Sequence, residues 1–129
     1  MSFYLDEIAR LNKTLYPHDD LTKKIKAAKL YIDKYFSEDI NLDKIAGKAL
    51  VSKFHFIRLF KKYYGYTPNQ YLQEVRIKKS KRLLEKGNSI DEVCLAIGFT
   101  SKTSFISLFK KMIGTTPLVY QNKKAKKQF

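Results

Sequence analysis

Two stretches of this chain are near copies of each other. Residues 52–71 read SKFHFIRLFKKYYGYTPNQY, and residues 101–120 read SKTSFISLFKKMIGTTPLVY. With a shift of 49 positions, 12 of the 20 aligned residues are identical, which is far more than chance gives in a chain of 129 residues. This repeat decides the fold, because it predicts the same local structure in two places.

Each copy carries the start and stop signals of a helix. A serine cap precedes each expected helix and a glycine follows it: Ser52, 53–64 and Gly65 in the first copy, and Ser101, 102–113 and Gly114 in the second. Apolar residues at helical spacing form the expected inward face: Phe56, Leu59, Phe60 and Tyr63, and Phe105, Leu108, Phe109 and Met112. A Thr-Pro pair then opens the next helix, because threonine caps and proline suits the first helical position.

A short helix is expected before each of these helices. Asn41 is placed to cap a helix carrying Leu42, Ile45 and Ala46, and Ser89-Ile90-Asp91-Glu92 is a capping box before Val93, Cys94 and Ile97. These segments align at a shift of 48, with one extra residue in the second turn. A short helix, a tight turn and a longer helix form a helix-turn-helix, so we predict two of them, over about 42–64 and 89–113.

The rest of the chain also has helical periodicity, and no strand pattern is visible. We expect a linking helix over about 68–86, and a helix over about 21–36 that Asp20 would cap. An amphipathic helix over about 3–15 would bear a stripe of Tyr4, Ile8, Leu11 and Leu15. The sequence therefore predicts an all-α protein with three regions: an N-terminal extension of 1–20, a double helix-turn-helix domain of 21–122, and a basic tail of 123–129.

The composition favours one small domain with a polyanionic partner. Lys and Arg number 26 against 12 Asp and Glu, which gives a net charge of +14, and 44% of the residues are hydrophobic. Residues 1–44 carry eight basic and eight acidic side chains, whereas residues 45–129 carry 18 basic and four acidic ones. Such a field favours nucleic acid through counterion release. A lysine-rich surface that only aids solubility would give the same charge.

Several function classes lack the residues that they need. Cys94 has no second cysteine to pair with, and with His18 and His55 it does not form a zinc-binding pattern. No nucleophile with a base, no paired carboxylates and no phosphate loop are visible, so we expect neither an enzyme nor a cofactor. The N-terminus does not resemble a secretory signal and no apolar run would span a membrane. A cytoplasmic protein is expected.

The helix over 53–64 is expected to point Phe54, Arg58 and Lys61 outward, with Ile57 at the edge. In a DNA major groove, arginine bonds guanine while phenylalanine and isoleucine pack on thymine methyl groups. We therefore predict that Phe54, Ile57 and Arg58 read bases. The alternative is that Phe54 folds back into the core.

In the second copy we predict base contacts by Lys102, Thr103 and Ser107, beside the edge residue Ile106. This set lacks an arginine, so the first copy should carry more of the sequence preference. The predicted contacts to the DNA backbone are Ser52, Lys53, Lys61, Lys62, Ser101, Ser104, Lys110 and Lys111. For Ser52 and Ser101, capping alone is an equally good interpretation.

Four motifs occur together: Ser52-Lys53-Phe54-His55-Phe56-Ile57-Arg58-Leu59-Phe60-Lys61-Lys62, Gly65-x-Thr67-Pro68-x-x-Tyr71, Gly98-Phe99-x-Ser101 and Phe109-Lys110-Lys111-x-x-Gly114-x-Thr116-Pro117. In combination they resemble the AraC/XylS DNA-binding domain over about residues 22–122. The resemblance implies a bacterial, seven-helix, two-lobed domain that usually activates transcription near RNA polymerase. It also implies that the readers lie at the positions predicted above.

The chain departs from the family pattern at three positions. Ser107 and Gln121 stand where the family usually has arginine, which should weaken contacts of the second copy with DNA. Ser80 stands where alanine is more usual, a change of slight consequence. Most members also have a ligand-sensing domain, which the extra N-terminal residues are too few to form, so no effector site is expected.

The expected function is therefore sequence-specific binding of double-stranded DNA by a transcription activator. A linking helix of about 28 Å is close to the ~34 Å between successive major-groove faces, so a monomer would suffice. The alternative is an interaction module, in which the basic surface or residues 3–15 bind another protein or an anionic lipid.

Overall fold

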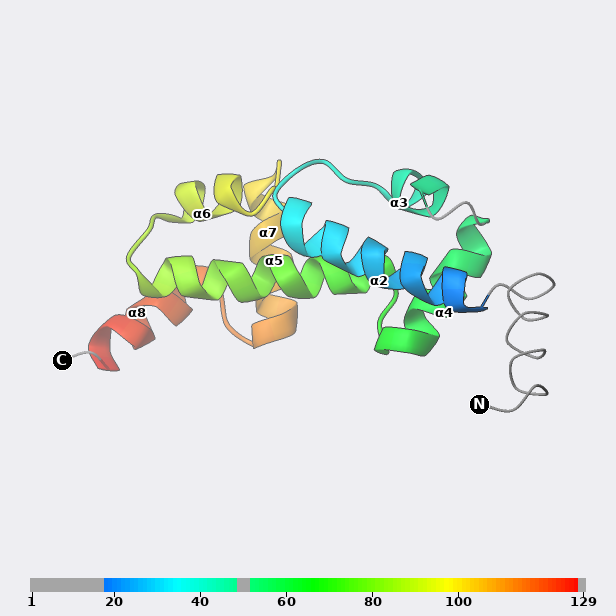
Figure 1. Ribbon diagram of the computed structural model, residues 1–129. Coiled ribbons are helices and arrows are strands. Elements are labelled where there is room, and N and C mark those ends of the chain that lie inside the picture. The colour runs from blue at the N-terminus through cyan, green and yellow to red at the C-terminus, as the bar shows by residue number, and fades with distance from the viewer. Residues whose placement is uncertain (1–17, 49–51, 128–129) are drawn as a thin grey trace, which may run out of the picture. The chain divides into compact units, whose positions relative to one another are not determined.

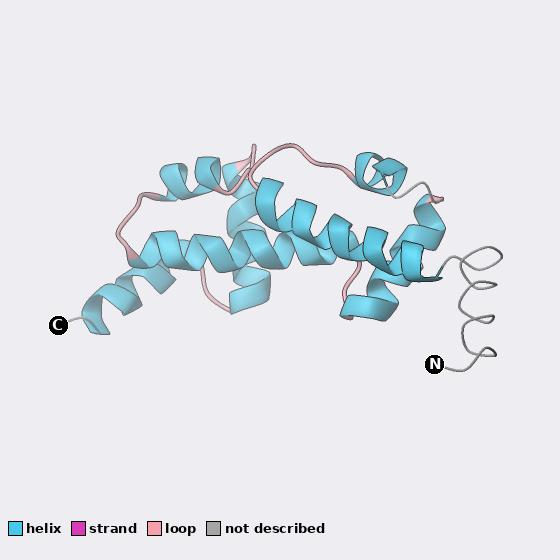
Figure 2. Cartoon of the chain, viewed as in Figure 1, coloured by secondary structure: helices cyan, strands magenta, loops and turns pink. Residues whose placement is uncertain are grey.

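The computed structural model describes residues 18–48 and 52–127, and every regular element in these ranges is an α-helix (Figure 2). The helices are α2 (His18–Tyr35), α3 (Leu42–Lys48), α4 (Lys53–Tyr64), α5 (Pro68–Glu85), α6 (Ile90–Ala96), α7 (Lys102–Ile113) and α8 (Pro117–Lys127). The all-α prediction is confirmed, and the helix expected over 3–15 lies outside the described residues. None of the described helices is long and apolar enough to cross a membrane.

The described residues form two compact units. The N-terminal unit comprises residues 18–32, 41–48 and 52–68, and the C-terminal unit comprises residues 33–40 and 69–127. Each unit contains one of the two predicted helix-turn-helix copies: α3 with α4 in the first, and α6 with α7 in the second.

The N-terminal unit is built around two phenylalanines of α4. Phe56 and Phe60 are fully buried, and the other buried hydrophobic residues of this unit are Ile25, Ala28 and Ile32 of α2 and Ile45 and Ala46 of α3. The ring centroids of Phe60 and Tyr64 are 4.9 Å apart, whereas Tyr63 is 49% exposed. The expectation that Tyr63 points inward is therefore wrong, because the inward ridge follows the i, i+4 positions 56, 60 and 64.

The C-terminal unit has one continuous core. Its buried residues are Ile77 and Leu84 of α5, Val93 and Cys94 of α6, Ile97 just after α6, Phe105 and Phe109 of α7, and Tyr120 of α8. In Figure 1, α6 and α8 lie on opposite sides of α5. The buried Ser80 donates its hydroxyl to the Ile77 carbonyl oxygen at 2.6 Å, so this polar group is satisfied within its own helix.

The predicted helix ends are present in both copies. The Ser52 Oγ accepts the N–H of His55 at 3.2 Å, and the Ser101 Oγ accepts the N–H of Ser104 at the same distance. Gly65 and Gly114 close the two helices with φ of 83° and 97°, a left-handed conformation that glycine adopts at little cost. The capping predictions for α4 and α7 are confirmed.

Two helix boundaries differ from the sequence prediction. α2 begins at His18 rather than after Asp20. α8 continues to Lys127, so most of the expected basic tail is helical. Lysine is a good helix former, and positive charge is favourable at a helix C-terminus.

Candidate nucleic-acid interface

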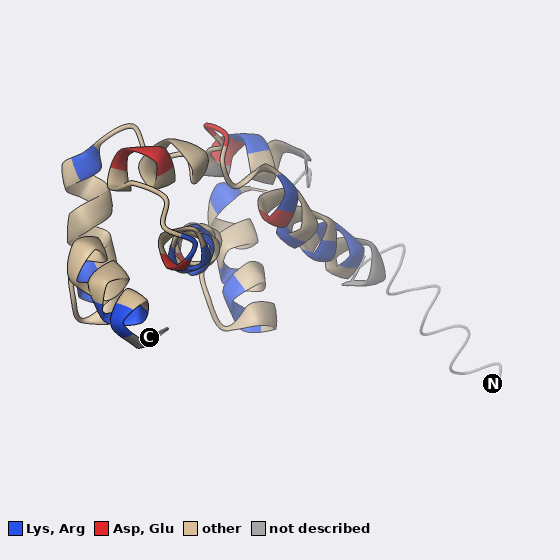
Figure 3. Cartoon of the chain, turned by 90° about the vertical axis from the view of Figure 1, so that its left-hand side faces the viewer, with Lys and Arg blue, Asp and Glu red and all other residues tan. Residues whose placement is uncertain are grey.

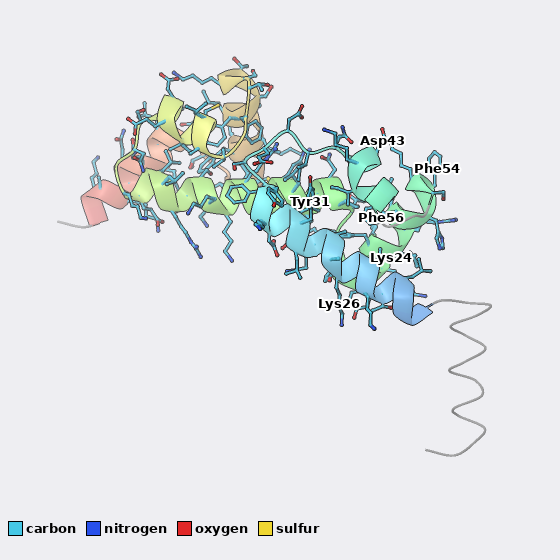
Figure 4. All side chains as sticks on the ribbon, turned by 45° about the horizontal axis from the view of Figure 1, so that its top comes forward. Lys24, Lys26, Tyr31, Asp43, Phe54 and Phe56 are labelled. Carbon is cyan, nitrogen blue, oxygen red and sulfur yellow. The ribbon has the colours of Figure 1, made fainter. Side chains whose placement is uncertain are left out.

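The start of α4 presents an aromatic and a basic side chain to solvent. Phe54 is 76% exposed and Arg58 is also exposed, whereas Ile57 is half-buried. Residues two positions away from Phe56 lie about 200° from it around the helix, so burial of Phe56 turns Phe54 and Arg58 outward. Figure 4 shows Phe54 at the outer side of α4. The alternative that Phe54 is a core residue is wrong.

The start of α7 presents a smaller and more polar surface. Lys102, Thr103, Ser104 and Ser107 are exposed, and Ile106 packs partly against the core. The three side chains predicted to read bases in the second copy are therefore all exposed to solvent. The two faces differ in size and charge, because the positions of Phe54 and Arg58 hold Thr103 and Ser107 in the second copy.

An ion pair at the start of the second helix is repeated in both copies. Lys53 Nζ lies 3.4 Å from Asp43 Oδ1, and Lys102 Nζ lies 3.1 Å from Asp91 Oδ1. All four side chains are about half or more exposed, and such surface pairs contribute only about 0–1 kcal/mol. Neither pair therefore holds its lysine firmly.

Exposed lysines continue along the solvent side of both helices. Lys61 and Lys62 lie in the last turn of α4, and Lys110 and Lys111 lie at the matching positions of α7. Figure 3 shows basic positions on these helices and on α2, α5 and α8, whereas acidic positions are few. Each lysine pair also lies at the negative end of its helix dipole, which favours the charge independently of any partner.

Arg76 of α5 has a positioning role that the sequence analysis missed. Its Nε donates to the Phe36 carbonyl oxygen at 2.7 Å and its Nη2 to the Glu38 carbonyl oxygen at 3.0 Å. The guanidinium also lies over the Phe99 ring, 5.6 Å from its centroid. Burial lowers the pKa of Arg76, and Asp39 acts in the opposite direction. Arg76 thus holds the segment that follows α2 by two hydrogen bonds and contacts the Phe99 ring, which precedes α7.

Gln121 contacts the segment at the end of α5. Its amide nitrogen donates to the carbonyl oxygen of Leu84, in the last turn of α5, at 3.0 Å and to that of Asn88, beyond the helix, at 2.7 Å. The Leu84 carbonyl oxygen also accepts the N–H of Gly87 at 3.0 Å. This half-buried side chain therefore connects α8 to the end of α5, and the weakening of DNA contacts by the missing arginine stays a prediction.

The remaining candidate reactive side chains are structural. Cys94 is 6% exposed and its Sγ lies 3.5 Å from the Phe99 carbonyl oxygen. Burial raises the pKa of the Cys94 thiol, nearby Asp91 raises it further, and Lys102 lowers it. A thiol held in its protonated form is a weak nucleophile. In the described ranges, no three His, Cys, Asp or Glu residues are grouped so that they could hold a metal ion.

Comparison with known proteins yields relatives of one kind. The family "Helix-turn-helix domain" matches residues 45–123. The HTH-type transcriptional activator Btr of Bacillus subtilis (strain 168) is 33% identical over 115 residues, which are 88% of this chain and 22% of Btr. The chain spans about a third of the length of the first curated relatives that it matches.

Solved structures of domains from two regulators have the same fold. The C-terminal domain of AraT, a response regulator from Geobacillus stearothermophilus, matches with a TM-score of 0.74 and 28% identity, over 78% of this chain and 84% of that one. The DNA-binding domain of AdpA, a global transcriptional factor solved in complex with a target DNA, matches with a TM-score of 0.73 and 27% identity, over 77% of this chain and 90% of that one.

Proposed function

This chain belongs to the AraC/XylS family of helix-turn-helix DNA-binding domains, and we propose that it is a sequence-specific transcription regulator that acts on double-stranded DNA. The observation that carries the proposal is the outward pair on α4. Phe54 and Arg58 are both exposed at the start of a helix whose opposite side is fully buried. An exposed phenylalanine beside an arginine matches the mixture of methyl groups and acceptors in a major groove.

The two copies would divide the work of recognition unequally. Arg58 would bond a guanine, and Phe54 and Ile57 would pack on thymine methyl groups. Lys102, Thr103 and Ser107 would contact bases with less discrimination, because lysine and short hydroxyl groups accept several arrangements. We therefore assign most of the sequence preference to the first copy.

Contacts to the DNA backbone would supply affinity without sequence preference. The side chains assigned to phosphates are Ser52, Lys53, Lys61, Lys62, Ser101, Ser104, Lys110 and Lys111. Lys53 and Lys102 would leave their ion pairs with Asp43 and Asp91 on binding. The strong positive charge of residues 45–129 would add long-range attraction to any duplex.

A monomer would engage two successive segments of the major groove. The 18 residues of α5 correspond to about 27 Å of helix, close to the ~34 Å of one DNA turn. We further propose an activator that contacts RNA polymerase in the cytoplasm of a bacterial cell. The support is that Btr, which matches most of this chain, is described as a transcriptional activator.

Two experiments test this function. The first selects the duplexes that the protein binds from a random pool, and the second measures how tightly two variants bind the best site. Arg58→Ala should lose about 1–3 kcal/mol at the selected site and relax the preference at one base pair. Lys110→Ala should weaken binding to all sequences and reduce the slope of log K against log salt by about 1. Uniform weakening by Arg58→Ala would make Arg58 a phosphate contact, and a pool without enrichment would overturn sequence specificity.

A further inference from the structure

A solvent-facing groove lies within the N-terminal unit, between the first turns of α2 and the last turns of α4. Its volume is about 320 Å³. The lining residues are Leu21, Thr22 and Ile25 of α2, and Leu59, Lys62 and Tyr63 of α4. Three of these six side chains are aliphatic, and the Tyr63 ring is 49% exposed. A groove with this floor is suited to apolar side chains.

The rim of the groove is cationic. Lys62 lines it directly. Lys26 of α2, which is labelled in Figure 4, has its Nζ 5.8 Å from the centroid of the Tyr63 ring. The ion pairs recorded in the described residues do not include Lys62. A suitable occupant therefore carries an apolar stripe with a carboxylate at its edge.

We propose that residues 3–15 of the same chain bind this groove as an amphipathic helix that runs antiparallel to the start of α2. The stripe of that segment consists of Tyr4, Ile8, Leu11 and Leu15. At 100° per residue, Glu7 lies about 70° from the centre of the stripe, whereas Asp6 and Lys13 lie on the opposite side. The segment thus offers four apolar side chains and one flanking carboxylate to the cationic rim.

The position of this segment in the chain favours it over other occupants. Only Tyr16 and Pro17 separate it from His18, the first residue of α2. Connections of 2–8 residues are typical of antiparallel helix pairs. A segment tethered this close has an effective concentration in the millimolar range, which a free ligand seldom reaches. Docking there would make residues 3–15 part of the N-terminal unit and would brace the last turns of α4.

Disulfide trapping in the full chain tests this docking. In a Cys94→Ala background, each of Ile8→Cys, Leu11→Cys and Leu15→Cys is combined with Tyr63→Cys, and Lys13→Cys with Tyr63→Cys is the matched control. A disulfide requires the two Cα atoms to lie within about 7 Å. At least one stripe pair should form an intramolecular disulfide about tenfold faster than the control, because docking holds the thiols together.

A second measurement covers the case in which no register of the cysteines suits a disulfide. Ile8→Asp should raise the hydrogen-exchange rates of the amides in the last turn of α4 by about tenfold relative to the unchanged chain, whereas Lys13→Glu should leave them unchanged. Equal rates in both variants, with no preferred disulfide, would overturn the docking. Disulfides formed only between chains would overturn it in favour of a second copy as the occupant. Neither measurement uses DNA, so a failure of this docking proposal would not count against the proposed function, which the DNA-binding experiments test separately.

Discussion

The two helix-turn-helix copies have nearly the same interior and different exteriors. Phe56 and Phe60 in the first copy correspond to Phe105 and Phe109 in the second, and all four are fully buried. The serine caps, the left-handed glycines and the lysine–aspartate ion pairs are also repeated. The outward positions differ, because one copy presents Phe54 and Arg58 where the other presents Thr103 and Ser107. The buried positions of the two helices are thus the same, whereas their exposed positions differ.

The largest expected loss of stability comes from substitutions in the interior that the two copies share. Phe56→Ala and Phe105→Ala should each destabilise their unit by about 3–5 kcal/mol, because each leaves a cavity where a fully buried ring was. Urea denaturation followed by circular dichroism measures the loss. A difference of more than about 2 kcal/mol between the two variants would show that the cores are not equivalent.

The second test concerns a place where the copies are not equivalent. Gly98, in the turn before α7, has φ of 88°, and a Cβ there would lie 2.7 Å from the Ser37 carbonyl oxygen. Gly98→Ala should therefore cost about 2–5 kcal/mol through left-handed strain and overlap with the backbone. The control is Gly114→Ala, with φ of 97° and open space around the site, which should cost only about 1–2 kcal/mol. Equal losses in denaturation would contradict the close packing on Ser37.

The third test separates the two interpretations of the serine caps. Ser52→Ala and Ser101→Ala should each lower the free energy of unfolding by about 0.5–2 kcal/mol, because each removes the acceptor of a backbone N–H. If capping is the whole role, the DNA affinity of the folded fraction should stay unchanged at low temperature. A lower affinity at a temperature where both variants are fully folded would add a phosphate contact to the capping role.

The smallest effect concerns Tyr120, which corresponds to Tyr71 in the first copy. Each of the two hydroxyl groups donates to a carboxylate, that of Tyr120 to Glu85 and that of Tyr71 to Asp33. Burial raises the pKa of Tyr120 to about 12, and the hydrogen bond to Glu85 and the charge of Glu85 act in the same direction. A raised pKa stabilises the fold below the unfolded value of about 10, and this contribution disappears as the pH rises to about 12. Tyr120→Phe should therefore lose less stability than the unchanged chain between pH 10 and 12 in urea denaturation. Parallel profiles would contradict the raised pKa.

Most of the fold could be predicted from local signals. The bounds of α4 and α7 follow from a serine cap at one end and a glycine at the other, and these signals act within a single turn of helix. The start of α2 could not be found in this way, because an acidic residue is favourable both as a cap and inside the first turn. The prediction that Tyr63 points inward was wrong for a related reason. Two adjacent tyrosines offer two inward phases, and only the packing on Phe60 selects Tyr64.

Residues far apart in the sequence account for the rest of what was missed. The bonds from Arg76 to the carbonyl oxygens of Phe36 and Glu38 span 40 and 38 positions, and the periodicity of a helix cannot predict contacts at such a separation. The bonds from Gln121 to the carbonyl oxygens of Leu84 and Asn88 likewise span 37 and 33 positions. Side chains that support a site are therefore harder to predict than the outward residues of the site itself.

The sequence by itself determined the repeat, the helices that the repeat contains and the outward position of Arg58, because helix periodicity and capping depend on residues a few positions apart. Only the tertiary structure decided that Phe54 stays out of the core, that Gly98 touches Ser37 and that Gln121 supports α5. These outcomes depend on which helices pack against each other, and packing is set by contacts between distant parts of the chain.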